Sequence, residues 1–149
     1  MEKLPPKEKI YEAFTAVADG RVEMKENRAA VVSSDASKSY KVVWRGNVYA
    51  STDNATYWQG YAGYPVICVL MLQGKLSADR GVVRMFSGVP WNALNNLYKR
   101  NYAEALRAAI AGLGLTQEQE SAAAEATEEI YSQLKKLDIR IVRKIKDEQ

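Results

Sequence analysis

The sequence predicts an α+β fold. An N-terminal helix precedes a small antiparallel β-sheet of about four short strands, and a mainly helical C-terminal half packs on that sheet. Two patterns indicate this order. Apolar residues recur at helical spacing near the N-terminus and again after residue 89, whereas residues 21–52 hold short β-branched and aromatic runs separated by turn sequences.

The length and composition of the chain fit one domain. It has 149 residues, of which 47% are hydrophobic and 26% charged. A chain of this size buries enough surface to fold without disulfides or metal. We expect a single domain over residues 1–149, made of an α+β body over 1–113 and a C-terminal helical arm over 116–149.

The first element is a helix over about residues 6–19. Two prolines stand before it or in its first turn, where proline is tolerated, and a glycine follows its end. Ile10, Phe14 and Val17 recur at helical spacing and form its apolar stripe. Its solvent side is expected to carry charged residues, namely Lys7, Glu8 and Glu12.

Four short strands are expected between residues 21 and 52. The clearest pair is a hairpin of residues 40–44 and 48–52, because Gly46-Asn47 between β-branched and aromatic runs is typical of a tight turn. Alternate residues of a strand point to opposite faces of its sheet. One face of the first hairpin strand therefore carries Tyr40, Val42 and Trp44, and the other carries Lys41, Val43 and Arg45.

The segment after the hairpin is less regular. Residues 52–56 are rich in Asp, Asn and Thr, which bond nearby backbone amides and predict a turn or a helix start. Residues 57–64 contain two glycines and predict an irregular stretch or a single helical turn. Residues 65–73 are mostly apolar, and their pattern leaves helix and strand open; Pro65 at the start and Gly74 at the end favour a helix.

Two longer helices are expected in the second half. The first runs from about residue 91 to residue 110, and glycines follow it. The second begins after Thr116, which has the form of a capping box with Gln119. Residues 138–146 fit either a helix or a strand. A helix to about residue 146 is favoured, because the apolar stripe continues through Ala123, Thr127, Ile130, Leu134, Leu137 and Ile141.

The composition disfavours most familiar catalysis. The chain has no histidine, the commonest general base and metal ligand. Its single cysteine, Cys68, lies in the apolar run and is expected to be a buried hydrophobe. Asp35 and Asp53 lie in turn sequences, where solvated carboxylates that accept backbone N–H bonds are expected. We therefore expect no catalytic residue, no metal and no cofactor.

A cytoplasmic location without a membrane anchor is also expected. The single cysteine allows no internal disulfide, which favours a reducing compartment. The first nine residues carry no apolar region of a secretory signal. The apolar run over 65–72 is far shorter than the ~20 residues that span a bilayer as a helix.

The strongest functional indication is that half of the aromatic residues lie between Tyr40 and Tyr64. Single-stranded nucleic acid stacks on aromatic rings beside cations, and Tyr, Trp and Arg also dominate protein interfaces. We therefore expect a non-catalytic binding or interaction module for nucleic acid or protein. Its candidate ligand-binding residues are Lys41, Trp44, Arg45, Tyr49, Tyr57, Trp58 and Tyr61.

An alternative is a small-molecule-binding protein, or a small enzyme that works without histidine, with its pocket near residues 57–72. A closed cavity that holds Asp53 or Cys68 with a shifted pKa would mark it.

The C-terminal arm indicates an interaction of its own. Residues 117–129 carry five acids and no base, whereas residues 135–146 carry six bases and one acid. Opposite charges at the two ends of a helix suit the helix dipole. They also suit antiparallel pairing of two copies, or a protein partner, through residues 116–146.

Overall fold

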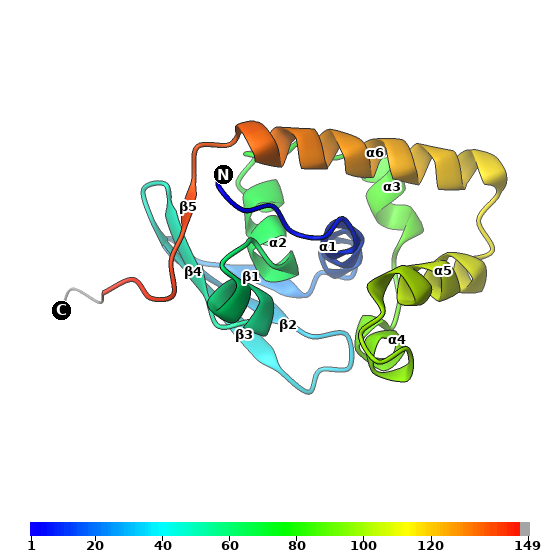
Figure 1. The fold of residues 1–149 in the computed structure, drawn as a ribbon, viewed down its shortest axis with the longest axis horizontal. Coiled ribbons are helices and arrows are strands. Elements are labelled where there is room, and N and C mark those ends of the chain that lie inside the picture. The colour runs from blue at the N-terminus through cyan, green and yellow to red at the C-terminus, as the bar shows by residue number, and fades with distance from the viewer. Residues whose placement is uncertain (147–149) are drawn as a thin grey trace.

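The computed structural model describes residues 1–146 and confirms the α+β class. Its sheet lies to one side of the molecule and its helices gather on the other (Figure 1). The elements in chain order are α1 (Glu8–Ala18), β1 (Val22–Met24), β2 (Arg28–Val32), β3 (Ser39–Arg45), β4 (Val48–Ser51), the π-helix η1 (Ala55–Gln59), α2 (Tyr64–Leu72), α3 (Arg80–Met85), α4 (Trp91–Leu97), α5 (Tyr102–Leu113), α6 (Gln117–Lys136) and β5 (Arg140–Ile141).

The sheet has the strand order β1-β2-β3-β4-β5. The first four strands form the expected antiparallel meander, and β5 is parallel to β4. The register pairs Ala29 with Val42 and Trp44 with Tyr49. Val42 and Tyr49 are fully buried under the helices, while Lys41 on the alternate face of β3 is exposed. The sheet therefore has one covered face and one open face, as its alternating sequence predicts.

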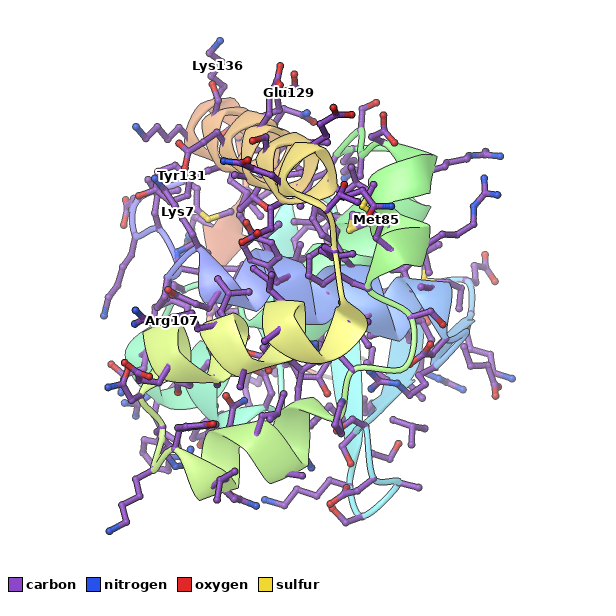
Figure 2. All side chains as sticks on the ribbon, turned by 90° about the vertical axis from the view of Figure 1, so that its right-hand side faces the viewer. Lys7, Met85, Arg107, Glu129, Tyr131 and Lys136 are labelled. Carbon is purple, nitrogen blue, oxygen red and sulfur yellow. The ribbon has the colours of Figure 1, made fainter. Side chains whose placement is uncertain are left out.

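Helix α1 is the centre of the helical half. It lies between α6 and α5, as the two views of the molecule show (Figures 1 and 2). Ile10, Ala13 and Phe14 on its apolar stripe are fully buried. The α6 stripe packs into the same core through Ala123, Ile130 and Leu134. On the surface of this contact, the Lys7 ammonium lies 2.6 Å from Glu128 and 4.9 Å from the Tyr131 ring centroid.

Several local predictions are confirmed. Residues 64–72 form helix α2, which has Pro65 in its first turn. Thr116 and Gln119 form the capping box, with each side chain bonded to the other's backbone N–H. Cys68 is a buried free thiol whose Sγ lies 3.6 Å from the Ala13 carbonyl oxygen, and burial raises the pKa of this thiol.

The C-terminal helix is shorter than the sequence predicts. It ends at Lys136, and Leu137 is already extended, with φ −74° and ψ 126°. The chain then forms β5, where the Arg140 N–H donates to Asn47 and the Val142 N–H donates to Tyr49, both over 2.9 Å. Expecting a helix to residue 146 was wrong, because β4 offers an open edge whose backbone groups need partners. In residues 138–146 the apolar residues fit both the alternation of a strand and the spacing of a helix. The sequence alone therefore does not distinguish a helix from a strand there.

The helix expected over residues 91–110 is two helices. Between α4 and α5, Lys99 and Arg100 both have left-handed backbones, with φ of 51° and 65°. Asn101 then caps α5, its side chain accepting the Glu104 N–H over 3.2 Å. The break carries no glycine or proline, so the helical spacing of apolar residues hides it. A short helix, α3, was also not anticipated.

None of the helices in residues 1–146 combines the length and the apolar character needed to span a membrane.

Candidate ligand-binding cleft

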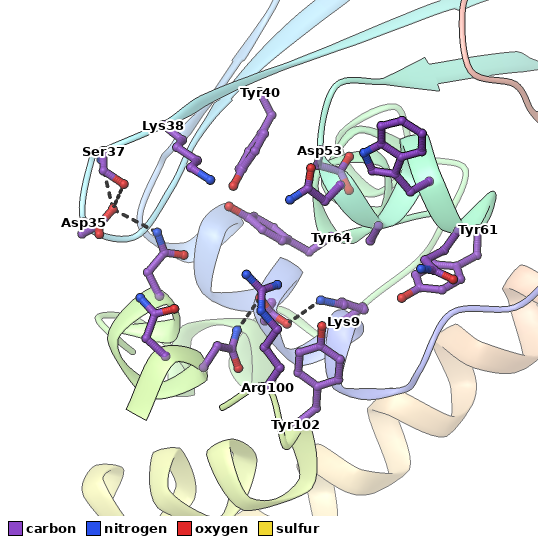
Figure 3. Close-up of a pocket in the computed structure, with 18 residues that line it drawn as sticks. Lys9, Asp35, Ser37, Lys38, Tyr40, Asp53, Tyr61, Tyr64, Arg100 and Tyr102 are labelled. Carbon is purple, nitrogen blue, oxygen red and sulfur yellow. Dashed lines mark hydrogen bonds and ion pairs between the residues drawn. The ribbon is translucent and has the colours of Figure 1, made fainter. Parts of the chain in front are cut away.

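A polar cleft of about 770 Å³ opens between the sheet side of the molecule and the α4–α5 side (Figure 3). The loop between β2 and β3 and the start of η1 form one wall, and the α4–α5 junction forms the other. Side chains of α1 lie at its base. Aromatic residues make much of the lining, namely Tyr40, Trp58, Tyr61, Tyr64 and Tyr102.

The base of the cleft holds a buried ion pair. Lys9 and Glu12 stand one turn apart on α1, with Nζ and Oε2 3.5 Å apart, and only 8% and 5% of these residues is exposed. Asn95 donates to Glu12 over 3.4 Å, and the Lys9 ammonium lies 4.2 Å from the Tyr102 ring centroid. Glu12 therefore does not lie on the solvent side of the first helix, as the sequence suggested.

The surroundings of this pair shift both pKa values. Burial raises the pKa of Glu12, while Lys9 and the hydrogen bond from Asn95 act in the opposite direction. Burial lowers the pKa of Lys9, but the nearby Glu12 and Tyr102 outweigh it, so the pKa of Lys9 is raised overall. Each member thus depends on the other, because a buried charge without its partner is costly.

Asp53 connects the sheet to the start of η1. Ser51 donates to Oδ1, and the backbone N–H and hydroxyl of Thr56 donate to Oδ2 over 3.0 and 3.1 Å. The Thr56 hydroxyl in turn accepts the Gly63 N–H over 2.9 Å. Asp53 does bond a backbone amide, as predicted, but it is only 5% exposed and so is not a solvated turn residue.

Asp35 fits its prediction better. It is exposed in the loop between β2 and β3, and its Oδ1 accepts bonds from the Ser37 N–H and hydroxyl over 3.0 and 2.6 Å. Ser33 and Asn92 donate to the same oxygen, each over 3.0 Å. These bonds, above all from the Ser37 hydroxyl, lower the pKa of Asp35 to about 2.

Two tyrosines form an aromatic wall. The rings of Tyr40 on β3 and Tyr64 on α2 meet edge to face, with centroids 6.2 Å apart. Their hydroxyl ends point toward one another in the cleft (Figure 3). Neither hydroxyl has a hydrogen-bond partner within residues 1–146, and burial, followed by the nearness of Tyr40, raises the pKa of Tyr64.

Two cations reach the cleft from opposite walls. Lys38 comes from the loop before β3 and Arg100 from the α4–α5 junction, and both point into the opening (Figure 3). Within the described chain neither forms an ion pair. The three carboxylates of the lining, on Glu12, Asp35 and Asp53, all have partners. The groups left to receive a ligand are therefore cations, hydroxyls and side-chain amides.

The structure divides the predicted binding residues between two places. Trp58 and Tyr61 line the cleft, whereas Lys41, Trp44 and Arg45 line a second groove on the open face of the sheet. Tyr57 packs edge to face on Trp58, with ring centroids 4.7 Å apart. Tyr49 is fully buried, and its hydroxyl donates to Gln73 and accepts from Lys75.

Sequence reasoning did not identify Lys9, Glu12, Arg100 or Tyr102 as site residues. Lys9 and Glu12 resemble an ordinary surface pair at helical spacing, and only tertiary packing buries them. A signal did exist for the α4–α5 wall: Asn101, three residues before Glu104, has the pattern of a helix start.

Fold and cleft together define an α+β protein with a polar, aromatic-lined cleft beside its sheet. The chain belongs to the family described as Uncharacterised conserved protein UCP014422, which it matches over residues 2–140. No curated protein and no solved structure matches it. In the described residues, no group of three or more Cys, Asp or Glu side chains is placed to hold a metal ion.

Proposed function

We propose that this protein is a binding protein for a small polar ligand, held in the cleft with an anionic group against Lys38 and Arg100. The proposal rests on one observation: the acidic side chains of the cleft lining have partners in the chain, whereas two of its basic side chains form no ion pair in the part of the chain that the structure describes. The carboxylates are held by groups of the chain itself, whereas Lys38 and Arg100 have no ion-pair partner within residues 1–146. A carboxylate or phosphate would supply that partner.

The size and walls of the cleft support the same proposal. Its volume of about 770 Å³ lies within the range of roughly 300–1,000 Å³ that is usual for small-molecule sites. The rings of Tyr40 and Tyr64 offer an apolar wall with a hydroxyl at its end, which suits a flat or ring-shaped part of a ligand. The backbone of Arg100 adds support, because left-handed conformations of non-glycine residues are costly and cluster at functional sites.

Thermal unfolding in the presence of graded compound panels tests this function. Carboxylates, phosphates, neutral sugars and amines are compared at equal concentration. We expect stabilisation by anionic members, because a ligand at 100 times its Kd adds about 2.7 kcal/mol to the free energy of unfolding. Stabilisation by amines alone, or by none of the four panels, would contradict the proposal.

A matched pair of variants then locates the site. Arg100→Asn removes the cleft cation, and Lys99→Asn removes its neighbour, which does not line the cleft. Asn tolerates the left-handed backbone that both positions share. Losing a hydrogen bond to a charged group should weaken binding roughly ten- to a hundredfold in Arg100→Asn. Lys99→Asn should bind as the wild type does, and equal losses in both variants would place the ligand elsewhere.

A further inference from the structure

A second groove, of about 680 Å³, lies on the open face of the sheet. Six cationic side chains line it, and no acid does so within residues 1–146. They are Arg28, Lys41, Arg45, Arg143, Lys144 and Lys146.

Two distant parts of the chain build this groove. Arg28 pairs in register with Val43 and Val43 with Ala50, so the outward side chains of β2, β3 and β4 form its floor. Residues 143–146, which follow β5, contribute its other side. Arg45 donates to the Lys146 carbonyl oxygen over 3.0 Å and so holds this segment in place. The basic residues 143–146, which were predicted to be helical, therefore lie beside the cations of the sheet.

Aromatic rings stand at the end of this groove. The Arg143 guanidinium lies 5.6 Å from the Tyr57 ring centroid and 5.1 Å from that of Trp58. The Trp58 residue is 61% exposed, which is unusual for so large an apolar group. Unpaired nucleotides bind through two kinds of contact, between phosphates and cations and between bases and aromatic rings. A row of cations next to an accessible ring offers both.

We propose that this groove binds single-stranded nucleic acid, with phosphates along the cations that line it and a base on Trp58. The cations of this groove are separate from those of the cleft, and within residues 1–146 the two proposed sites share only Trp58. A single strand is favoured over a duplex because only unpaired bases can stack on a side chain. A membrane surface is disfavoured, because the apolar lining residues Val43, Trp44, Ala50 and Ile145 are all buried or half-buried. The single exposed ring within residues 1–146, Trp58, is small beside the apolar face that membrane-surface helices insert.

Fluorescence anisotropy of a labelled 15-nucleotide oligo(dT), titrated with protein at several salt concentrations, tests the groove. Each phosphate contact to a single strand contributes roughly −0.7 to the slope of log K against log salt. Contacts from the five cations other than Arg45, which is already bonded to the Lys146 carbonyl oxygen, therefore give a slope of about −3.5. Lys41→Ala should flatten that slope by about 0.7. Lys136→Ala, at an exposed position of α6 outside the groove, is the matched control and should not change it.

Three results would overturn the proposal. The first is unchanged anisotropy at low salt, and the second is an equal loss of affinity in Lys41→Ala and Lys136→Ala. The third is preferential binding of duplex DNA or of anionic phospholipid vesicles over the oligonucleotide. Both lysines are exposed, so we expect both variants to fold as the wild type does. Circular dichroism of each variant checks this.

Discussion

Gly63 occupies a position where any side chain would collide with the Asp53 network. A Cβ at this residue would lie against the Asp53 carboxylate and 2.9 Å from the Thr56 hydroxyl. The backbone itself is ordinary, with φ −70° and ψ 174°, so the restriction comes from space and not from conformation. The hydrogen bonds that join β4, η1 and α2 therefore depend on the absence of one methyl group.

Gly63→Ala is expected to lower the free energy of unfolding by about 2–3 kcal/mol, because overpacking displaces buried hydrogen-bonded groups. Gly112→Ala is the matched control, since a Cβ there meets nothing within 4 Å and the residue lies inside α5. That change should stabilise the protein by roughly 0.5–1 kcal/mol through helix propensity. Urea unfolding measures both, and a neutral Gly63→Ala would show that the Asp53 network can shift at little cost.

Asp35 makes stability depend on pH in a defined direction. Its pKa is about 2 in the folded state and 3.8 in the absence of its hydrogen bonds. A lowered carboxyl pKa stabilises the fold above the unfolded value, so this contribution is complete above about pH 5 and is lost as pH falls from 3.8 through 2. The difference in unfolding free energy between wild type and Asp35→Asn should shrink over that window.

Titration followed by carboxyl-carbon NMR checks the cause of the lowered pKa. Ser37→Ala removes the hydroxyl that contributes most, so the pKa of Asp35 should move up toward 3.8 in this variant. An unchanged Asp35 pKa in Ser37→Ala would assign the effect to the Ser37 backbone amide, to Ser33 or to Asn92 instead.

At the scale of elements, the sequence is informative where local and tertiary preferences agree. The capping box at Thr116 and the hairpin turn at Gly46 act through neighbouring residues, and both form as predicted. The end of α6 was predicted wrongly and the break before α5 was missed, because at these places tertiary contacts override the local pattern. Their outcome depends on the open edge of β4 and on two left-handed residues, which no periodicity encodes.

The α4–α5 break can be tested through the strain at Lys99. Replacing it with glycine, which adopts a left-handed backbone freely, should leave stability unchanged or raise it by up to about 1 kcal/mol. Glu125→Gly, at an exposed position inside α6, should cost about 1 kcal/mol instead. Chemical denaturation of the two variants therefore should give opposite or clearly unequal changes, and equal losses would mean that residue 99 is helical in solution.

At the scale of the whole molecule, the sequence does not tell which distant residues come together in the candidate site. The concentration of aromatic residues predicted a binding region, and two of the predicted residues, Trp58 and Tyr61, line the cleft. Their neighbours Lys9, Arg100 and Tyr102 come from elements far away in the chain, so only the packing of α1 and α5 brings them together. The sequence likewise grouped Lys41 with Trp58. In the fold Lys41 lines the groove, whereas Trp58 lines the cleft and lies beside Arg143 at the end of the groove.

The same packing bears on the predicted pairing of two copies through the C-terminal arm. The apolar seam of α6 is already used by the chain itself, since Ile130 and Leu134 are fully buried in the common core. Unfolding should consequently be a single cooperative transition with a Tm that does not vary with protein concentration.

Ile130→Ala should then lower the free energy of unfolding by about 2–5 kcal/mol, the usual cost of an emptied core position, while the transition stays single. Ser132→Ala, at an exposed position on the same helix, should stay within about 0.5 kcal/mol of the wild type. Calorimetry at two protein concentrations, tenfold apart, shows whether the apolar seam of α6 packs only within its own chain or also pairs with a second copy. A Tm that rises with concentration in the wild type and loses that dependence in Ile130→Ala would mean that α6 pairs with a second copy, because only an interface between chains responds to mass action.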